Sequence, residues 1–258
     1  MWTIGFIGTG NISSDVISGI CNSSLKLNKI IVSPRNKKKA KILKKKFKSK
    51  ILISKNNQDL IDKSDWVFLG VLPEIGEKIL PNLKFKKNQL VISFLSTTNL
   101  KKLRKLIKSK VIIVRAIPMP PIAIGKGPVA IFPANKKVKL FFNKIGNVFE
   151  IKNEILYKNY WAISGTMALY YQMLKSLSDW LINKKINKID AQKYVTSLYL
   201  ALSSLAYIKS DKSLKNLVNN SQTPGGLNWQ GLLDLKKTNY YKNLNKILSK
   251  IHKRLNKS

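Results

Sequence analysis

Short apolar runs alternate with amphipathic stretches from the start of the chain to about residue 150. The apolar runs predict β-strands at residues 2–8, 29–33, 51–54, 64–71, 88–96 and 110–118. The amphipathic stretches predict helices, of which the clearest lie at residues 11–24, 36–48 and 99–107. Strands that are apolar on both faces and alternate with helices favour a mostly parallel sheet with helices on both sides.

The pattern changes near residue 150, because no convincing strand follows. Helical periodicity covers residues 160–186, 190–210 and 239–255, and the stretch NNSQTPGGLNWQ at 219–230 interrupts it with turn-forming residues. We therefore predict an α/β domain at residues 1–152 and an all-α domain at residues 153–258. The all-α part is unusually apolar. Its apolar helix faces form either its own core or an interface between copies of the chain.

The first predicted strand runs directly into Gly8-Thr9-Gly10 and then into the first predicted helix. Gly8 permits a tight turn and Gly10 lets a pyrophosphate approach the backbone, while Ser13 stands where a third glycine is usual. The N–H groups and positive dipole end of a helix N-terminus bind phosphate. The stretch predicts a Rossmann-type dinucleotide site, and the alternative is a glycine turn with no ligand.

The end of the second predicted strand reads VSPRNKKK and contains no carboxylate. An Asp or Glu at this point usually binds the ribose 2′-hydroxyl of NAD. Ser33, Arg35 and Asn36 instead suit a 2′-phosphate, which an arginine can bind through two hydrogen bonds. We therefore expect NADPH to be preferred over NADH. The alternative is that Arg35 begins a solvated basic helix.

The composition is strongly basic, with 48 Lys and Arg against 12 Asp and Glu and a net charge of +36. Such a charge is typical of nucleic-acid-binding proteins. The lysines here are spread over the whole chain beside many Asn and Ile residues, which favours solvated positions over a basic block. We expect no specific nucleic-acid partner, and we expect the charge to favour anionic ligands such as nucleotides.

Cys21 and His252 are the single cysteine and the single histidine. They exclude an internal disulfide framework and a Ser–His–Asp triad, and they argue against a zinc site, so no metal is predicted. No apolar run reaches the ~18 residues of a membrane span, and the N-terminus shows no secretory pattern. These features lead us to expect a cytoplasmic protein without a membrane partner.

Six motifs, in this order along nearly the whole chain, resemble the pyrroline-5-carboxylate reductase family. They are GFIGTGNIS at the N-terminus, SPRN at 33–36, VFLGVLPE at 67–74, VRAIPMPPIAIGKGPVAI at 114–131, SGTMALYY at 164–171 and TPGGLNWQGL at 223–232. The resemblance implies a Rossmann domain followed by a helical dimerisation domain, assembled as a homodimer or a higher homo-oligomer. It also implies NAD(P)H-dependent reduction of a cyclic imino acid, 1-pyrroline-5-carboxylate, to proline, a step of proline biosynthesis.

The resemblance implies two sets of site residues. Cofactor contacts would fall on Gly8, Thr9, Gly10, Asn11, Ile12, Ser33, Arg35, Asn36, Val71, Leu72 and Pro73. Substrate contacts would fall on Thr223, Gly225, Gly226, Leu227, Asn228, Met119, Ser164 and Thr166, with Thr223 and Asn228 in the catalytic roles.

Hydride transfer to an iminium carbon fits a chain with one histidine, because the substrate nitrogen can arrive already protonated. The cofactor supplies the reactivity and the protein supplies orientation and electrostatics. In TPGGLNWQ, Pro224 fixes its own φ and the two glycines bare the backbone. A helix beginning at Leu227 would offer its free N–H groups to the substrate carboxylate. The alternative is an ordinary turn between helices.

The run PMPPIA at 118–123 is interpreted as a rigid crossover between the domains.

The chain departs from the family at positions near the expected chemistry. The family commonly has Lys at the position of Leu72, Asn at that of Met119 and Thr at that of Asn228, and Met167 alters the start of the long helix. Three hypotheses follow. The protein reduces pyrroline-5-carboxylate or a close cyclic imino acid; it reduces a different imine or a 2-oxo compound with the same fold; or it is a basic NADP-binding protein without enzymatic activity.

Overall fold

The computed structural model describes residues 2–256, and it divides the chain into two compact units. The first unit runs to Trp161 and also includes Leu255 and Asn256. The second unit is Ala162–Arg254. The domain boundary expected between residues 152 and 153 stays a prediction.

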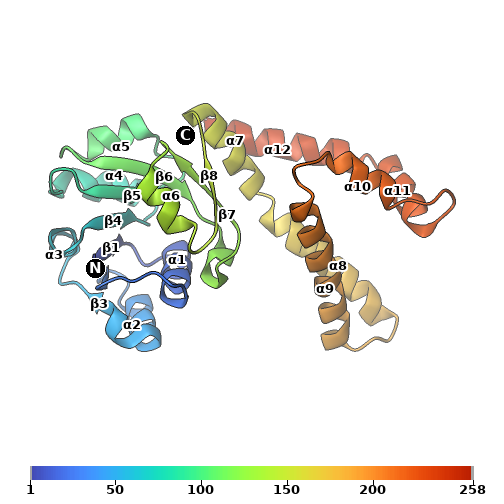
Figure 1. The fold of residues 1–258 in the computed structure, drawn as a ribbon, viewed down its shortest axis with the longest axis horizontal. Helices are drawn as coiled ribbons and strands as arrows, with labels where there is room; N and C mark the ends of the chain where they lie inside the picture. The colour runs from blue at the N-terminus through green and yellow to red at the C-terminus, as the bar shows by residue number, and fades with distance from the viewer. Residues whose placement is uncertain (1, 257–258) are drawn as a thin grey trace. The chain divides into compact units, whose positions relative to one another are not determined.

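The first unit contains a single eight-stranded sheet (Figure 1). Its strands are β1 (Ile4–Ile7), β2 (Ile30–Val32), β3 (Ile51–Ile53), β4 (Trp66–Leu69), β5 (Leu90–Ser93), β6 (Ile112–Ile117), β7 (Pro128–Phe132) and β8 (Asn147–Glu150). They lie in the order β3-β2-β1-β4-β5-β6-β7-β8, and every neighbouring pair is parallel except β6 and β7. The predicted α/β class and the mostly parallel sheet are confirmed.

Helices cover both faces of this sheet because successive strand residues point to opposite sides. Phe6 packs into one core cluster and the next residue, Ile7, into the other. The first cluster includes side chains of α1 (Asn11–Asn22), α2 (Lys37–Phe47) and α6 (Lys136–Phe142). The second lies under α3 (Asn57–Lys63), α4 (Pro73–Ile79), the short 3-10 turn η2 (Leu80–Asn82) and α5 (Leu100–Leu106). A further 3-10 turn, η1 (Lys48–Lys50), follows α2.

The interpretation of residues 118–123 as a crossover between domains is wrong. The segment forms the short helix η3 (Pro120–Ile124), which connects β6 to β7 within the first unit. Ile122 is 1% exposed and belongs to the same core cluster as α1. The prolines therefore shape a reversal of chain direction, after which β7 runs antiparallel to β6. The strand predictions stopped at residue 118 and so missed β7 and β8.

The second unit is helical throughout its described part. Helix α7 (Glu154–Ser164) leads into it, and its own helices are α8 (Met167–Asn183), α9 (Lys188–Ile208), α10 (Leu214–Asn220), α11 (Leu227–Lys237) and α12 (Tyr240–Asn256). No strand occurs between residues 151 and 256, which confirms the all-α prediction. Many large apolar side chains of this unit are exposed, among them Trp180 (61%), Leu200 (68%) and Ile208 (75%). Within residues 2–256, no helix combines the length and apolar character needed to cross a membrane.

Candidate active site

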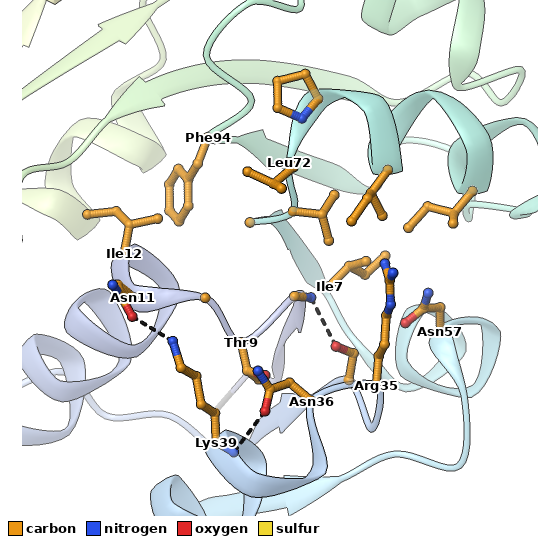
Figure 2. A pocket seen from close by; sticks show the side chains of 18 of the residues that line it. Ile7, Thr9, Asn11, Ile12, Arg35, Asn36, Lys39, Asn57, Leu72 and Phe94 are labelled. Atoms are coloured by element: carbon orange, nitrogen blue, oxygen red, sulfur yellow. Dashed lines mark hydrogen bonds between the residues drawn. The ribbon is translucent and has the colours of Figure 1, made fainter.

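A cleft of about 810 Å³ lies at the carboxyl ends of the central strands of the first unit (Figure 2). The chain runs outward from β1 through β2 to β3 and then returns to β4 on the other side of β1. Ligands of such sheets bind where the connections leave in opposite directions. The cleft is lined by the segments that follow β1, β2, β4 and β5, together with Asn57 and the start of α4.

The glycine turn after β1 forms the floor of this cleft. Gly8 has φ +99, and a Cβ atom added there would lie 2.5 Å from the Gly70 carbonyl oxygen, so only glycine fits. The Gly8 N–H donates a hydrogen bond of 3.0 Å to Ser33 Oγ, which ties the turn to the end of β2. Helix α1 begins at Asn11, and no side chain caps its N-terminus. Its first N–H groups and its dipole therefore suit a phosphate.

Close packing of α1 against the sheet depends on two small residues. Ser13 is fully buried, and a Cβ atom on Gly70 would collide with its hydroxyl oxygen. A small residue at position 13 therefore suffices for packing. Gly70 also lines the cleft, and the prediction missed it although a glycine directly after a buried strand was a usable signal.

Cations and amides gather at the end of β2. Figure 2 shows Arg35 and Asn57 on one side of the cleft, opposite Ile12 and Phe94. The Asn36 side chain caps α2 by accepting a hydrogen bond of 3.1 Å from the Lys39 backbone N–H. Lys39 Nζ donates to Asn11 Oδ1 at 2.5 Å, which links α2 to the start of α1.

The donor set of the cleft fits a phosphorylated dinucleotide. Arg35, Lys37 and Lys39 line it, and none of its lining residues is an Asp or Glu. Among residues 2–256, no group of three or more His, Cys, Asp or Glu side chains could hold a metal ion. All eleven residues predicted to contact a cofactor line this cleft. Their role as cofactor ligands stays a prediction, because the geometry shows only that these residues line the same cleft.

The end of the cleft away from Arg35 is more apolar. Val71, Leu72 and Pro73 follow β4, and Pro73 occupies the first turn of α4. Phe94 and Ser96 follow β5. Sequence reasoning missed several lining residues, because none of them belongs to a recognisable cofactor motif. Five lie on α2, α3 and α4, namely Lys37, Lys39, Asn57, Ile75 and Ile79, and Phe94 and Ser96 follow β5.

The predicted substrate residues fall into three places. Most of them form one turn in the second unit, where Gly225 has φ +75 and the Gly226 N–H donates to the Thr223 carbonyl at 2.8 Å. Helix α11 begins at Leu227, as expected, with no side-chain cap. Asn228 Nδ2 donates to the Ser221 carbonyl at 3.0 Å, so part of this amide already closes the turn.

The remaining predicted substrate residues belong to other elements of the chain. Ser164 ends α7, and Thr166 precedes α8 with its hydroxyl donating to the Ile163 carbonyl at 2.7 Å. Met119 belongs to the first unit and directly precedes η3. The substrate and catalytic roles of all these residues stay predictions.

Comparisons with known proteins match both parts of the chain. Residues 3–97 match a family described as NADP oxidoreductase, coenzyme F420-dependent, and residues 154–258 match the pyrroline-5-carboxylate reductase dimerisation family. The chain is 26% identical over 248 residues to a pyrroline-5-carboxylate reductase of Synechocystis, with 92% of this chain and 91% of the relative covered. It is 25% identical to one of Haemophilus influenzae, with 86% and 85% covered.

Solved structures are similar over the full length. The reductase of Streptococcus pyogenes has a TM-score of 0.84 at 23% identity and covers 100% of this chain and 99% of its own. The Plasmodium falciparum pyrroline carboxylate reductase, solved with NADP bound, has a TM-score of 0.84 at 24% identity, with 98% and 97% covered.

The fold and the cleft thus define a two-part protein with a Rossmann-type dinucleotide site and a helical dimerisation region. The described helices add a surface too apolar for a lone chain, in keeping with a homo-oligomer. Within that class, residues 154–258 match the pyrroline-5-carboxylate reductase dimerisation family, and the whole chain is similar to pyrroline-5-carboxylate reductases.

Proposed function

We propose that the protein reduces 1-pyrroline-5-carboxylate to proline with NADPH, by hydride transfer to the imine carbon. The observation that carries the proposal is the cleft at β1, β2, β4 and β5, which has a glycine turn, three cations and no carboxylate among its lining residues. The match of residues 154–258 to the dimerisation family supports the choice of reaction.

The cofactor would be held by the residues that the cleft already brings together. The Gly8–Gly10 turn and the N-terminus of α1 suit the pyrophosphate. Arg35 at the end of β2 suits the 2′-phosphate, because a guanidinium binds phosphate oxygens through two hydrogen bonds. The reduced nicotinamide supplies the hydride when the cofactor is bound.

The turn at residues 223–228 would hold the substrate carboxylate. The uncapped N-terminus of α11 offers backbone N–H groups, and Thr223 adds a hydroxyl. Asn228 Nδ2 keeps one N–H beyond its bond to Ser221, and this N–H can bind the carboxylate. A protonated imine needs no side-chain acid, in keeping with a cleft whose lining contains no carboxylate or histidine.

We further propose that the working form is a homodimer or a higher homo-oligomer, buried mainly through residues 153–215. Exposed apolar side chains of α8 and α9 support this, and Tyr194 (67%) and Leu200 (68%) are examples. The cytoplasmic location and the lack of a specific nucleic-acid partner stay predictions from the composition.

The test is NADPH oxidation by the purified full chain with three substrates: 1-pyrroline-5-carboxylate, a six-membered cyclic imino acid and a 2-oxo acid. We expect the five-membered imine to be used with the highest kcat/KM and the product to be proline. Preference for the six-membered imine or the 2-oxo acid would establish the alternative reductase, which Met119 and Asn228 make the chief competitor. NADPH binding without reduction of any of the three would favour the non-enzymatic alternative.

A further inference from the structure

A buried arginine holds the loop that follows β5. Arg115 lies on β6, is 2% exposed, and its Nη2 donates a hydrogen bond of 3.0 Å to the Ser96 carbonyl. Its Nη1 forms an ion pair with Oε1 of Glu154, the first residue of α7. The same Oε1 atom accepts a hydrogen bond of 2.9 Å from the Leu100 backbone N–H. The pair therefore fixes both ends of residues 96–100.

The surroundings of the pair keep its guanidinium in place. The Tyr157 ring covers it, with 4.6 Å between Arg115 Cζ and the ring centroid. Tyr157 is fully buried, and this burial raises the pKa of its hydroxyl. A charge buried in this way needs an ionic partner, because an unpaired buried charge is costly. Glu154 supplies that partner while its own side chain stays 28% exposed.

The braced loop lines the part of the cleft where a nicotinamide would rest. Strand order places β2, β1, β4 and β5 side by side. A dinucleotide with its pyrophosphate at the β1 turn and its 2′-phosphate at Arg35, beyond β2, must extend its other half towards β4 and β5. Phe94 and Ser96 line the cleft at that end, and Figure 2 shows Phe94 on the side opposite Arg35.

We propose that Arg115 and Glu154 are positioning residues: by fixing residues 96–100 they hold the wall of the cleft against which the nicotinamide half of the cofactor rests. The proposal rests on the proposed function for the identity of the cofactor. A positioning role differs from a purely structural role, because losing the pair should weaken binding of the nicotinamide half of the dinucleotide and leave binding of the other half unchanged.

The experiment compares two ligands of the purified full chain. NADPH has both halves of the dinucleotide, whereas adenosine 2′,5′-bisphosphate has the adenosine and the 2′-phosphate but no nicotinamide. Dissociation constants are measured by titration for the unaltered chain and for Glu154→Ala, Glu154→Gln and Arg115→Met. Glu150→Ala is the control, because Glu150 pairs with Lys139 with a similar side-chain exposure of 30% and does not line the cleft.

We expect Glu154→Ala to weaken NADPH binding about tenfold, the size of one lost charge-assisted hydrogen bond, with the bisphosphate changed less than about twofold. Glu154→Gln keeps an oxygen that can accept from both Leu100 and Arg115 but removes the ionic partner of the guanidinium, so it should restore part of the NADPH affinity that Glu154→Ala loses. Glu150→Ala should change neither ligand. Arg115→Met should act like Glu154→Ala, and if it does not fold, Glu154→Ala decides alone.

Equal weakening of both ligands by Glu154→Ala, or no change in either, overturns the positioning role. The proposed function fails separately. If the unaltered chain binds NADPH, Glu154→Ala shows the selective loss, and pyrroline-5-carboxylate is not reduced, the positioning role stands and the proposed reaction falls. A chain that binds neither ligand overturns both.

Discussion

The two units of this chain complete their apolar packing in different ways. In the first unit, large side chains such as Phe6, Phe68 and Phe142 are fully buried within one chain. In the second, the buried residues are few and small, such as Ala191, while Trp180 and Leu200 remain exposed. Soluble chains rarely leave contiguous apolar surface of this kind uncovered. The comparison indicates that the first unit covers its large apolar side chains within one chain, whereas the second leaves apolar surface for another copy of the chain to cover.

The largest effect should come from placing a charge on the exposed apolar surface of α9. Leu200→Glu would bury an unpaired carboxylate in the interface, which costs several kcal/mol, so we expect the subunit dissociation constant to rise about 100-fold or more. Ile42→Glu is the control, because Ile42 is 55% exposed on α2 of the first unit. Light scattering at micromolar concentration should show Leu200→Glu as a monomer and Ile42→Glu as the parent oligomer. If the unaltered chain is already monomeric, the apolar surface of the second unit is not covered by another copy, and the proposed difference between the units is wrong.

The next effect concerns the glycine turn, which belongs to the first unit alone. Gly8→Ala would place a Cβ atom 2.5 Å from the Gly70 carbonyl oxygen at φ +99, and we expect NADPH affinity to fall about 100-fold because the strained turn must move. Gly125→Ala has a similar left-handed φ of +72 with nothing within 4 Å of the added atom. It should lower stability slightly and leave NADPH affinity unchanged. Titration of both variants measures this, and equal losses would show that the turn is not the phosphate site.

Arg35→Ala tests whether the cleft prefers NADPH over NADH. Loss of one charge-assisted contact to the 2′-phosphate should cost about 1–3 kcal/mol of NADPH binding and leave NADH binding unchanged. Arg104→Ala, on α5 and outside the cleft, controls for the lost positive charge. The dissociation constants of both cofactors test the prediction. Equal affinities for NADPH and NADH in the unaltered chain would contradict it.

Asn228→Ala, in the second unit, should have the smallest effect. The change should appear in the kinetics of substrate reduction and not in cofactor binding. The amide also bonds to the Ser221 carbonyl, so its removal loosens the turn as well as removing a substrate contact. We expect kcat/KM to fall by a factor equivalent to about 0.5–1.5 kcal/mol, with NADPH affinity unchanged. Asn216→Ala on α10 is the matched control. If Asn228→Ala lowers NADPH affinity and leaves kcat/KM unchanged, Asn228 contacts the cofactor and not the substrate.

The sequence predicted the elements whose signals are local. The buried runs at β1 to β6 and the glycine turn follow from apolar pattern and backbone sterics, and the helix start at Leu227 follows from the Gly225-Gly226 turn. β7 and β8 were missed because β7 begins at a proline, Pro128, and β8 is a short, largely exposed strand without a continuous apolar run. Residues such as Lys39 and Ser96 reach the cleft through tertiary packing, which no short motif records. The Arg115–Glu154 pair joins residues 39 positions apart and was invisible for the same reason.

The most direct test of the proposed reaction is the transfer of deuterium from NADPH labelled at C4 of the nicotinamide to 1-pyrroline-5-carboxylate. The protein is incubated with each of the two stereospecifically labelled cofactors, and the product is analysed by mass spectrometry and NMR. One of the two should give proline with a single deuterium on the ring carbon that was the imine carbon. Unlabelled proline with both cofactors, or no proline at all, would contradict hydride transfer to this imine.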